Sequence, residues 1–191
     1  MISPFSSNSF RVTSPYGERT LNGKREFHAG IDLVGVGTTE ICAVASGTVV
    51  VSQMISDKNN KTWEWGNYIC IHGDDGRYYY YCHLAMRNVA AGVHVEKGHM
   101  IGFMGSSGFC YGAHLHLEIR EKDGVTTVNP ADVLGIKNAV GVYELDTLEA
   151  DLAVLARHGV VNTPDYWIAN ANKLRYLPEL IKKMARVLEQ K

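Results

Sequence analysis

The chain has 191 residues, 46% of them hydrophobic and 20% charged, with a formal net charge of −1. This composition is typical of a folded globular protein, and the length allows one domain with its own core plus a small appendage. The balanced charge gives no electrostatic basis for binding nucleic acid or an anionic membrane surface. No apolar run approaches the roughly 20 residues of a membrane span, and we expect no secretory signal because the N-terminus lacks basic and apolar regions.

Residues 1–135 predict a mainly β domain, because short apolar and β-branched runs alternate with glycine-containing turns. The expected extended segments are residues 11–17, 27–33, 41–45, 48–54, 67–72, 77–83, 98–105 and 114–119. A polar loop separates two of them at 56–62, and Asp75-Gly76 indicates a tight hairpin turn. No amphipathic helix lies between these runs, so the pattern favours an antiparallel sandwich or half-open barrel.

After this β domain the sequence pattern becomes helical. Residues 129–135 predict one helical turn that closes the β domain, and residues 136–144 are a plausible linker. Residues 145–191 predict a small helical domain of unknown role, with a capping signal at Asp146–Glu149 and a C-cap glycine at Gly159. A second start signal lies at 162–165, and Pro178 should kink, break or start a helix. The expected apolar stripe consists of Leu174, Leu177, Ile181, Met184 and Leu188.

The four cysteines are spread widely and form no Cys-x-x-Cys motif. Cys42, Cys70 and Cys82 lie in apolar, strand-like runs, so we expect reduced thiols that pack in the core. Disulfides are the alternative, followed by a cysteine-bound metal.

Two histidines on one predicted strand point to a metal. On a β-strand alternate side chains share a face, so His114, His116 and Glu118 are expected on one side. Adjacent imidazoles beside the glycine-rich run 105–112 suggest a metal site, whereas a hydrogen-bonded surface pair is the alternative.

A second motif, His28-Ala-Gly-Ile-Asp32, supplies another imidazole and a carboxylate. In an extended segment a separation of four keeps His28 and Asp32 on one side, and Gly30 between them allows close approach of a neighbour. Two imidazoles and one carboxylate suit tetrahedral Zn²⁺. The helical motif His-Glu-x-x-His is absent from the chain, which excludes that class of zinc peptidase.

A third motif, Tyr81-x-His83-Leu84, completes a set that resembles the lysostaphin/LytM-type zinc metallopeptidases. The resemblance extends through Ser14–Arg19, Ala45–Val49 and Val95–Gly102, and so covers roughly residues 10 to 135. It implies a β-sheet core with a groove, a Zn²⁺ cofactor and cleavage of peptides in bacterial peptidoglycan.

The same resemblance implies a role for each matched residue. His28, Asp32 and His116 correspond to the zinc ligands, and His83 and His114 to the two catalytic histidines that do not bind the metal.

No motif glutamate is present to take a proton from water, so we expect His114 to be the general base. His83 is then expected to hold the oxyanion or protonate the leaving amine. Glu118 is expected to make a structural or second-sphere hydrogen bond rather than to act in catalysis. The chain departs from the family in the loop before His114, where Phe109 and Tyr111 would narrow one wall of the groove.

The alternative function is a non-catalytic wall-binding or phage structural module that keeps the fold; a zinc peptidase acting on proteins is a further one. The expected site of action is the bacterial cell wall, for a phage-associated or a secreted protein. The C-terminal helices would bind wall polymer, contact a partner, form an oligomer or cap the β domain. Arg19 is expected either to contact substrate or to form a surface salt bridge, and the Trp63–Trp65 segment to be a binding platform or part of the core.

Overall fold

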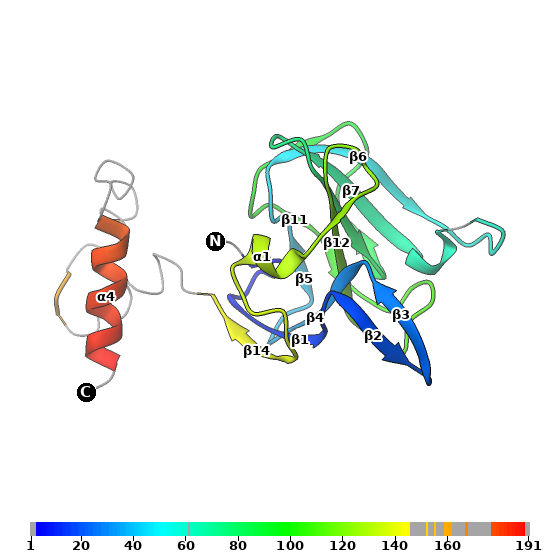
Figure 1. Cartoon of the computed structure of the whole chain (residues 1–191). Helices are drawn as coiled ribbons and strands as arrows, with labels where there is room; N and C mark the ends of the chain where they lie inside the picture. The colour runs from blue at the N-terminus through cyan, green and yellow to red at the C-terminus, as the bar shows by residue number, and fades with distance from the viewer. Residues whose placement is uncertain are drawn as a thin grey trace. The chain divides into compact units, whose positions relative to one another are not determined.

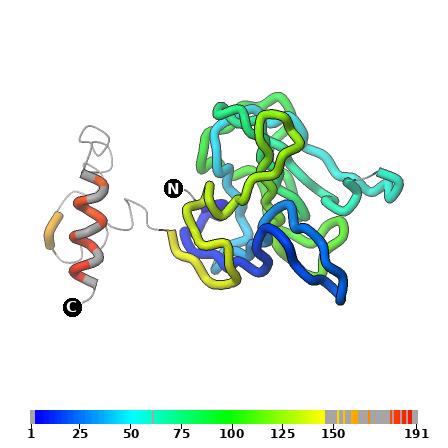
Figure 2. The backbone as a smooth tube through the Cα atoms, in the orientation of Figure 1, coloured from blue at the N-terminus to red at the C-terminus, as the bar shows by residue number. Residues whose placement is uncertain are grey.

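The computed structural model describes residues 3–60, 62–145, 152, 155, 159–161, 167 and 177–189. It forms two compact units, one within residues 2–144 and one within residues 145–191 (Figures 1 and 2). The three-part division predicted from the sequence remains a prediction.

An antiparallel sheet is the frame of the first unit. Its strands follow the order β10-β6-β7-β8-β12-β4-β1-β14, and β13 pairs with β12 off this path (Figure 1). Their bounds are β1 (Ser9–Ser14), β4 (Gly30–Gly35), β6 (Gly47–Met54), β7 (Asn67–Gly73), β8 (Tyr78–Cys82), β10 (His94–Val95), β12 (Leu115–Arg120), β13 (Thr127–Val128) and β14 (Gly141–Glu144). The mainly antiparallel β fold expected for this domain is confirmed.

Two smaller groups of strands accompany the main sheet. One is a three-stranded antiparallel sheet in the order β5 (Glu40–Cys42), β11 (Met100–Met104), β9 (Leu84–Arg87). The other is the hairpin of β2 (Gly17–Leu21) and β3 (Lys24–His28), which the sequence analysis did not predict. Its signal is the Asn22-Gly23 turn, where both residues have positive φ, 51° and 76°, as in the tight turn that this dipeptide favours.

Alternation along the strands separates the core from the groove side of the sheet. Leu115, Leu117 and Ile119 of β12 are fully buried, on the face opposite His116 and Glu118. In β8, Tyr79 and Tyr81 are buried, whereas Tyr78 and Tyr80 are less covered. The Tyr81 hydroxyl accepts a hydrogen bond from the backbone N–H of Val44 at 2.9 Å inside the core.

Short helices close the first unit. The one-turn helix η1 (Trp63–Trp65) precedes β7, and α1 (Pro130–Leu134) follows β13. α1 lies within the helical turn predicted at 129–135; it begins with Pro130, is capped by Asn129 and ends before Gly135, whose φ is 67°.

Part of the segment 136–144, for which the sequence predicts a linker, belongs to the main sheet. Residues 141–144 form β14, which pairs with β1 from Ser9 to Val12. Figure 2 shows these segments, blue and yellow, side by side. The alternating pattern of Gly141–Glu144 is too short to be recognised as a strand without its partner.

The second unit contains α4 (Leu177–Glu189), with Pro178 in its first turn, so this proline starts a helix. A small core consists of Leu152, Leu155, Ile181 and Ala185. Gly159 has φ 69°, and the next N–H bonds to the carbonyl of Leu155, which agrees with the predicted C-cap. The predicted starts at 146–149 and 162–165, and Leu174, lie outside the described residues. Among the described helices none is long and apolar enough to cross a membrane.

All four cysteines are free thiols, in agreement with the prediction. Cys42, Cys70 and Cys82 are buried. Burial raises the pKa of Cys70 to about 12 and raises that of Cys82 well above its ordinary value. These two thiols therefore stay protonated at neutral pH, and packing is their role.

Removal of the buried Tyr81 hydroxyl should destabilise the fold, because the N–H of Val44 would lose its partner inside the core. We expect Tyr81→Phe to lower the free energy of unfolding by about 1–3 kcal/mol, measured by urea denaturation. The matched control is Tyr143→Phe, whose exposed hydroxyl bonds to the carbonyl of Ala139. Equal stability of the two variants would contradict this role for the Tyr81 hydroxyl.

Candidate metal centre

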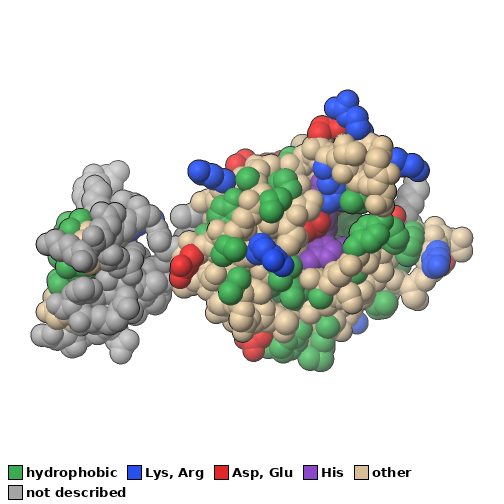
Figure 3. All heavy atoms as spheres, turned by 90° about the horizontal axis from the view of Figure 1, so that it is seen from below, with side chains coloured by type: hydrophobic (Ala, Val, Ile, Leu, Met, Phe, Trp, Pro, Cys, Tyr) green, Lys and Arg blue, Asp and Glu red, His purple; other side chains and the backbone are tan. Residues whose placement is uncertain are grey.

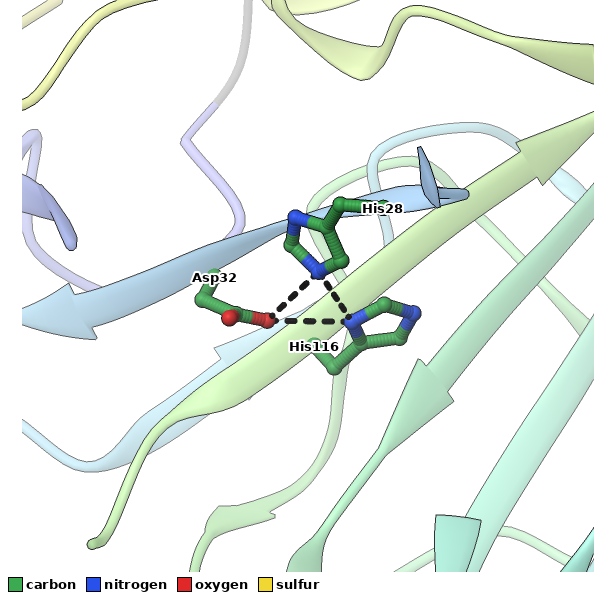
Figure 4. A group of neighbouring side chains, drawn as sticks. All are labelled: His28, Asp32 and His116. Atoms are coloured by element: carbon green, nitrogen blue, oxygen red, sulfur yellow. Dashed lines mark hydrogen bonds and ion pairs between the residues drawn. The ribbon is translucent and has the colours of Figure 1, made fainter. Parts of the chain in front are cut away.

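Three neighbouring strands bring together His28, Asp32 and His116 (Figure 4). His28 is the last residue of β3, Asp32 lies within β4, and His116 lies within β12. The antiparallel register places His116 directly opposite Asp32. The sequence predicted His28 and Asp32 on one extended segment. In the structure this segment is divided at Ala29 into two strands, so this detail was wrong, although the two side chains do meet.

The ligand atoms form a nearly equilateral triangle. His28 Nε2 lies 3.1 Å from His116 Nδ1 and 3.2 Å from Asp32 Oδ1, and the third side, His116 Nδ1 to Asp32 Oδ1, is 3.0 Å. Tetrahedral bonds of 2.0–2.1 Å to a central zinc ion would set ligand atoms about 3.3 Å apart. The donor set and its spacing therefore fit Zn²⁺ with a slight expansion.

Gly30 makes room for one of these rings. A Cβ at this position would lie 2.7 Å from the Cε1 and Nε2 atoms of His116 and 2.6 Å from the carbonyl oxygen of Leu117. The close approach predicted at Gly30 is therefore made by His116 itself.

Neighbouring groups set the protonation of the three candidate ligands. The Nδ1–H of His28 donates to the carbonyl of Pro15 at 2.8 Å, which leaves Nε2 with its lone pair. Burial favours a neutral Asp32, but the three imidazoles of His114, His116 and His28 around it hold the pKa of this carboxyl far below its usual range. Burial also opposes charge on His116, yet Asp32 and Glu118 raise its pKa to about 9. Metal binding at neutral pH must therefore displace a proton from His116.

The two histidines expected to be catalytic flank the triangle. His114 lies just before β12, with Nε2 3.5 Å from Asp32 Oδ1. Its ring centroid lies 4.7 Å from that of His83. Both rings bond through Nδ1 to backbone carbonyls, His114 to Gly112 at 2.8 Å and His83 to Ser107 at 2.9 Å. Each ring therefore keeps Nε2 for another partner.

His83 has an unusual backbone, with φ 64°, and its N–H donates to the carbonyl of Trp65 at 2.9 Å. It follows β8, which lies inside the sheet between β7 and β12. Burial, with the neighbouring charges of His114 and His116, lowers the pKa of His83 to about 4. The ring is therefore neutral at pH 7.

A hollow in the surface of the first unit has histidine side chains at its floor and hydrophobic side chains along one side (Figure 3). The loop before His114 carries Phe109 and Tyr111, which are 51% and 71% exposed. Phe109 lies next to Trp63, with ring centroids 6.0 Å apart. The hydroxyl of Tyr111 accepts a hydrogen bond from Asn22, at the tip of the β2–β3 hairpin, at 2.7 Å.

Arg19 belongs to the surroundings of the candidate metal centre. Its guanidinium pairs with Glu26 at 2.7 Å and lies 3.4 Å from Oδ2 of Asp32, the oxygen outside the triangle. The sequence allowed a substrate contact or a surface salt bridge, but gave no sign of this link to Asp32, because the hairpin that creates it was not predicted. Trp65 packs against Tyr68 and Tyr80, so its ring is part of the hydrophobic packing around Tyr68 and Cys70.

The sequence profile of "Peptidase family M23" matches residues 26–130, more than half of the chain. The chain belongs to this family. The match contains all five histidine and aspartate positions described above.

Curated relatives support this assignment to the M23 family. The chain is 32% identical over 125 residues to DD-carboxypeptidase/endopeptidase Mpg of Neisseria meningitidis, which covers 64% of this chain and 27% of Mpg. It is 33% identical over 111 residues to peptidoglycan DD-endopeptidase ShyC of Vibrio cholerae, covering 56% of this chain and 24% of ShyC. The chain thus spans about a quarter of the length of these M23 relatives.

Solved structures share the fold. The catalytic domain of lysostaphin from Staphylococcus simulans aligns with a TM-score of 0.56 and 29% identity, covering 66% of this chain and 92% of that domain. The catalytic domain of the prophage-encoded M23 protein EnpA from Enterococcus faecalis aligns with a TM-score of 0.52 and 33% identity, covering 63% and 88%.

A methyl group at Gly30 should displace the His116 ring from the triangle. We expect Gly30→Ala to weaken zinc binding and to lower stability by roughly 1–3 kcal/mol, because the strand and the ring must both shift. Zinc affinity is measured by competition with a chromophoric chelator. Gly141→Ala is the control, since a Cβ there meets its nearest atoms at 3.6 Å or beyond. Wild-type zinc affinity in Gly30→Ala would show that the ring does not need this space.

Proposed function

We propose that this M23 chain is a zinc-dependent endopeptidase that hydrolyses peptide bonds in bacterial peptidoglycan. The observation that carries the proposal is the triangle of His28, Asp32 and His116 with two further histidines beside it. The named activities of ShyC and Mpg, both endopeptidases, support the reaction class. The name of ShyC also supports peptidoglycan as the substrate.

His28, Asp32 and His116 would hold the metal through Nε2, one carboxylate oxygen and Nδ1. Bound zinc supplies Lewis acidity toward a peptide carbonyl and a water of lowered pKa. The remaining chemistry is proton transfer, and the chain offers histidines for it rather than a glutamate.

We assign the removal of a proton from the attacking water to Nε2 of His114. Its Nδ1–H is engaged by the Gly112 carbonyl, so Nε2 is the atom that can accept, and it lies 3.5 Å from the carboxylate of Asp32. The carboxylate then stabilises the imidazolium that forms.

We assign the protonation of the leaving amine to His83. Its ring is neutral at pH 7 and has Nδ1 fixed on the Ser107 carbonyl, so it donates from Nε2 only after receiving a proton there. The adjacent ring of His114, which has taken the proton of the water, supplies it. The hydrogen bonds that His83 donates to the Ser107 and Trp65 carbonyls hold it in a single orientation for this step.

His114→Ala and His83→Ala should each keep zinc bound while activity falls by about 10²–10⁴-fold, because a positioned acid or base contributes that much. Zinc content is measured by atomic absorption, and activity by new amino termini released from purified sacculi. His94→Ala, at an exposed position beside Asp74, is the matched control and should retain activity. Zinc lost from either of the first two variants would make that histidine a ligand instead.

Chelation should abolish activity, and added Zn²⁺ should restore it, because three of the proposed active-site residues have no catalytic role without the metal. Mass spectrometry of fragments from walls with different cross-bridges would identify the bond that is cut. Activity unchanged by full removal of zinc would refute the mechanism. Zinc-loaded protein that cuts no wall type would instead support the alternative of a wall-binding module.

A further inference from the structure

We propose that Glu118 and Arg120 are positioning residues that orient the ring of His116 for metal binding. The inference rests on the proposed function, because it assumes that His116 is a zinc ligand. Neither residue belongs to the triangle of ligand atoms.

Glu118 lies behind the ring of His116 as seen from the metal position. Its side chain is only 3% exposed, and Oε2 lies 3.5 Å from Nε2 of His116, the ring nitrogen opposite the one in the triangle. The two residues are i and i+2 on β12, so they share one face of the sheet. A carboxylate at Nε2 favours a proton on that nitrogen and thus leaves Nδ1 free to bind the metal.

The second oxygen of Glu118 is bound by Arg120, the next residue on the same face. The Nε–H of Arg120 donates to Oε1 at 2.5 Å, so the two carboxylate oxygens have separate partners. A carboxylate this buried would be costly without a charged partner. Arg120 thus keeps Glu118 ionised and turned so that Oε2 faces His116.

Arg120 is itself held in place on several sides. Its guanidinium lies over the rings of Tyr80 and Trp65, 4.8 Å and 5.5 Å from their centroids. Its Nη1 donates to the carbonyl of Gly124 at 3.1 Å. The sequence of contacts therefore runs from packed aromatic rings through Arg120 and Glu118 to the ligand His116.

His28 provides a comparison within the same site. Its outer nitrogen donates to a backbone carbonyl, that of Pro15, which no side-chain substitution removes. The outer partner of His116 is a side chain, and its contribution can therefore be measured by mutation.

The test is the zinc affinity of Glu118→Gln in the full chain, measured by competition with a chromophoric chelator. Glutamine has nearly the same volume as glutamate, but its amide has only one oxygen. If that oxygen accepts from His116, the NH₂ group faces Arg120, and the contact with Arg120 that orients the side chain is lost. We expect zinc to bind about 10–100-fold more weakly, as for other outer partners of ligating histidines. The visible spectrum of the Co²⁺-substituted protein should also change, since it reports ligand geometry.

The chain offers a matched control in the adjacent ion pair of Arg77 and Glu121, 3.2 Å apart and partly exposed. Glu121→Gln and Arg77→Met remove the same kind of contact without touching His116, and should leave zinc affinity and the Co²⁺ spectrum unchanged. Arg120→Met should weaken zinc binding while Glu118 itself remains.

A measurement on the unaltered protein does not depend on the folding of any variant. In zinc-loaded wild type, nitrogen-15 spectra of the histidines should show a proton on Nε2 of His116. The chemical shift of this nitrogen should be that of an N–H group that donates a hydrogen bond. Wild-type zinc affinity in folded Glu118→Gln, or a His116 Nε2 without its proton, would overturn the inference. Wild-type protein that binds no zinc would refute the proposed function instead, so the two failures are distinguishable.

Discussion

The candidate metal centre depends on the register between β4 and β12. Because these strands are antiparallel and Asp32 faces His116, two ligands meet without any loop having to be ordered. The same register places Gly30 opposite Glu118, and the missing side chain at Gly30 leaves the space that the imidazole of His116 fills. A shift of one residue would turn His116 into the core and bring Leu115 or Leu117 to the groove. The fully buried leucines on the opposite face oppose such a shift.

Charge in the site is unusually concentrated around one carboxylate. Asp32 contacts three imidazoles, and Arg19 approaches its second oxygen. Four histidines close together would repel one another if all were protonated, and the protein resolves this by keeping His83 neutral while His116 shares its charge with carboxylates. Backbone carbonyls fix the tautomers of His28 and His114. The entropic cost is small, because these carbonyls are already held in place by the fold and no further side chain has to be ordered.

Much of this arrangement was predictable because strand alternation and residue type act locally. The face of β12, its buried leucines and the pairing of two histidine motifs follow from a period of two and from ligand chemistry. What failed depends on contacts distant in sequence. β3 and β4 are separate strands, divided at Ala29, because the β2–β3 hairpin leaves the main sheet. The interior position of β8 was equally hidden, since strand order is set by pairing with β12 and not by the residues around His83. The links from Arg19 and Arg120 to the ligands became visible only with the fold.

The pairing of β14 with β1 has a practical meaning for anyone who shortens this chain. A protein cut at residue 135, the boundary that the sequence suggests, would lose the edge strand and uncover the N–H and C=O groups of β1. Open edges of this kind recruit strands from other molecules. Because β1 also pairs with β4, self-association at that edge would act next to the strand that carries Asp32. Solubility and the geometry of the candidate metal centre would then be lost together, for a reason that lies far along the sequence from Asp32.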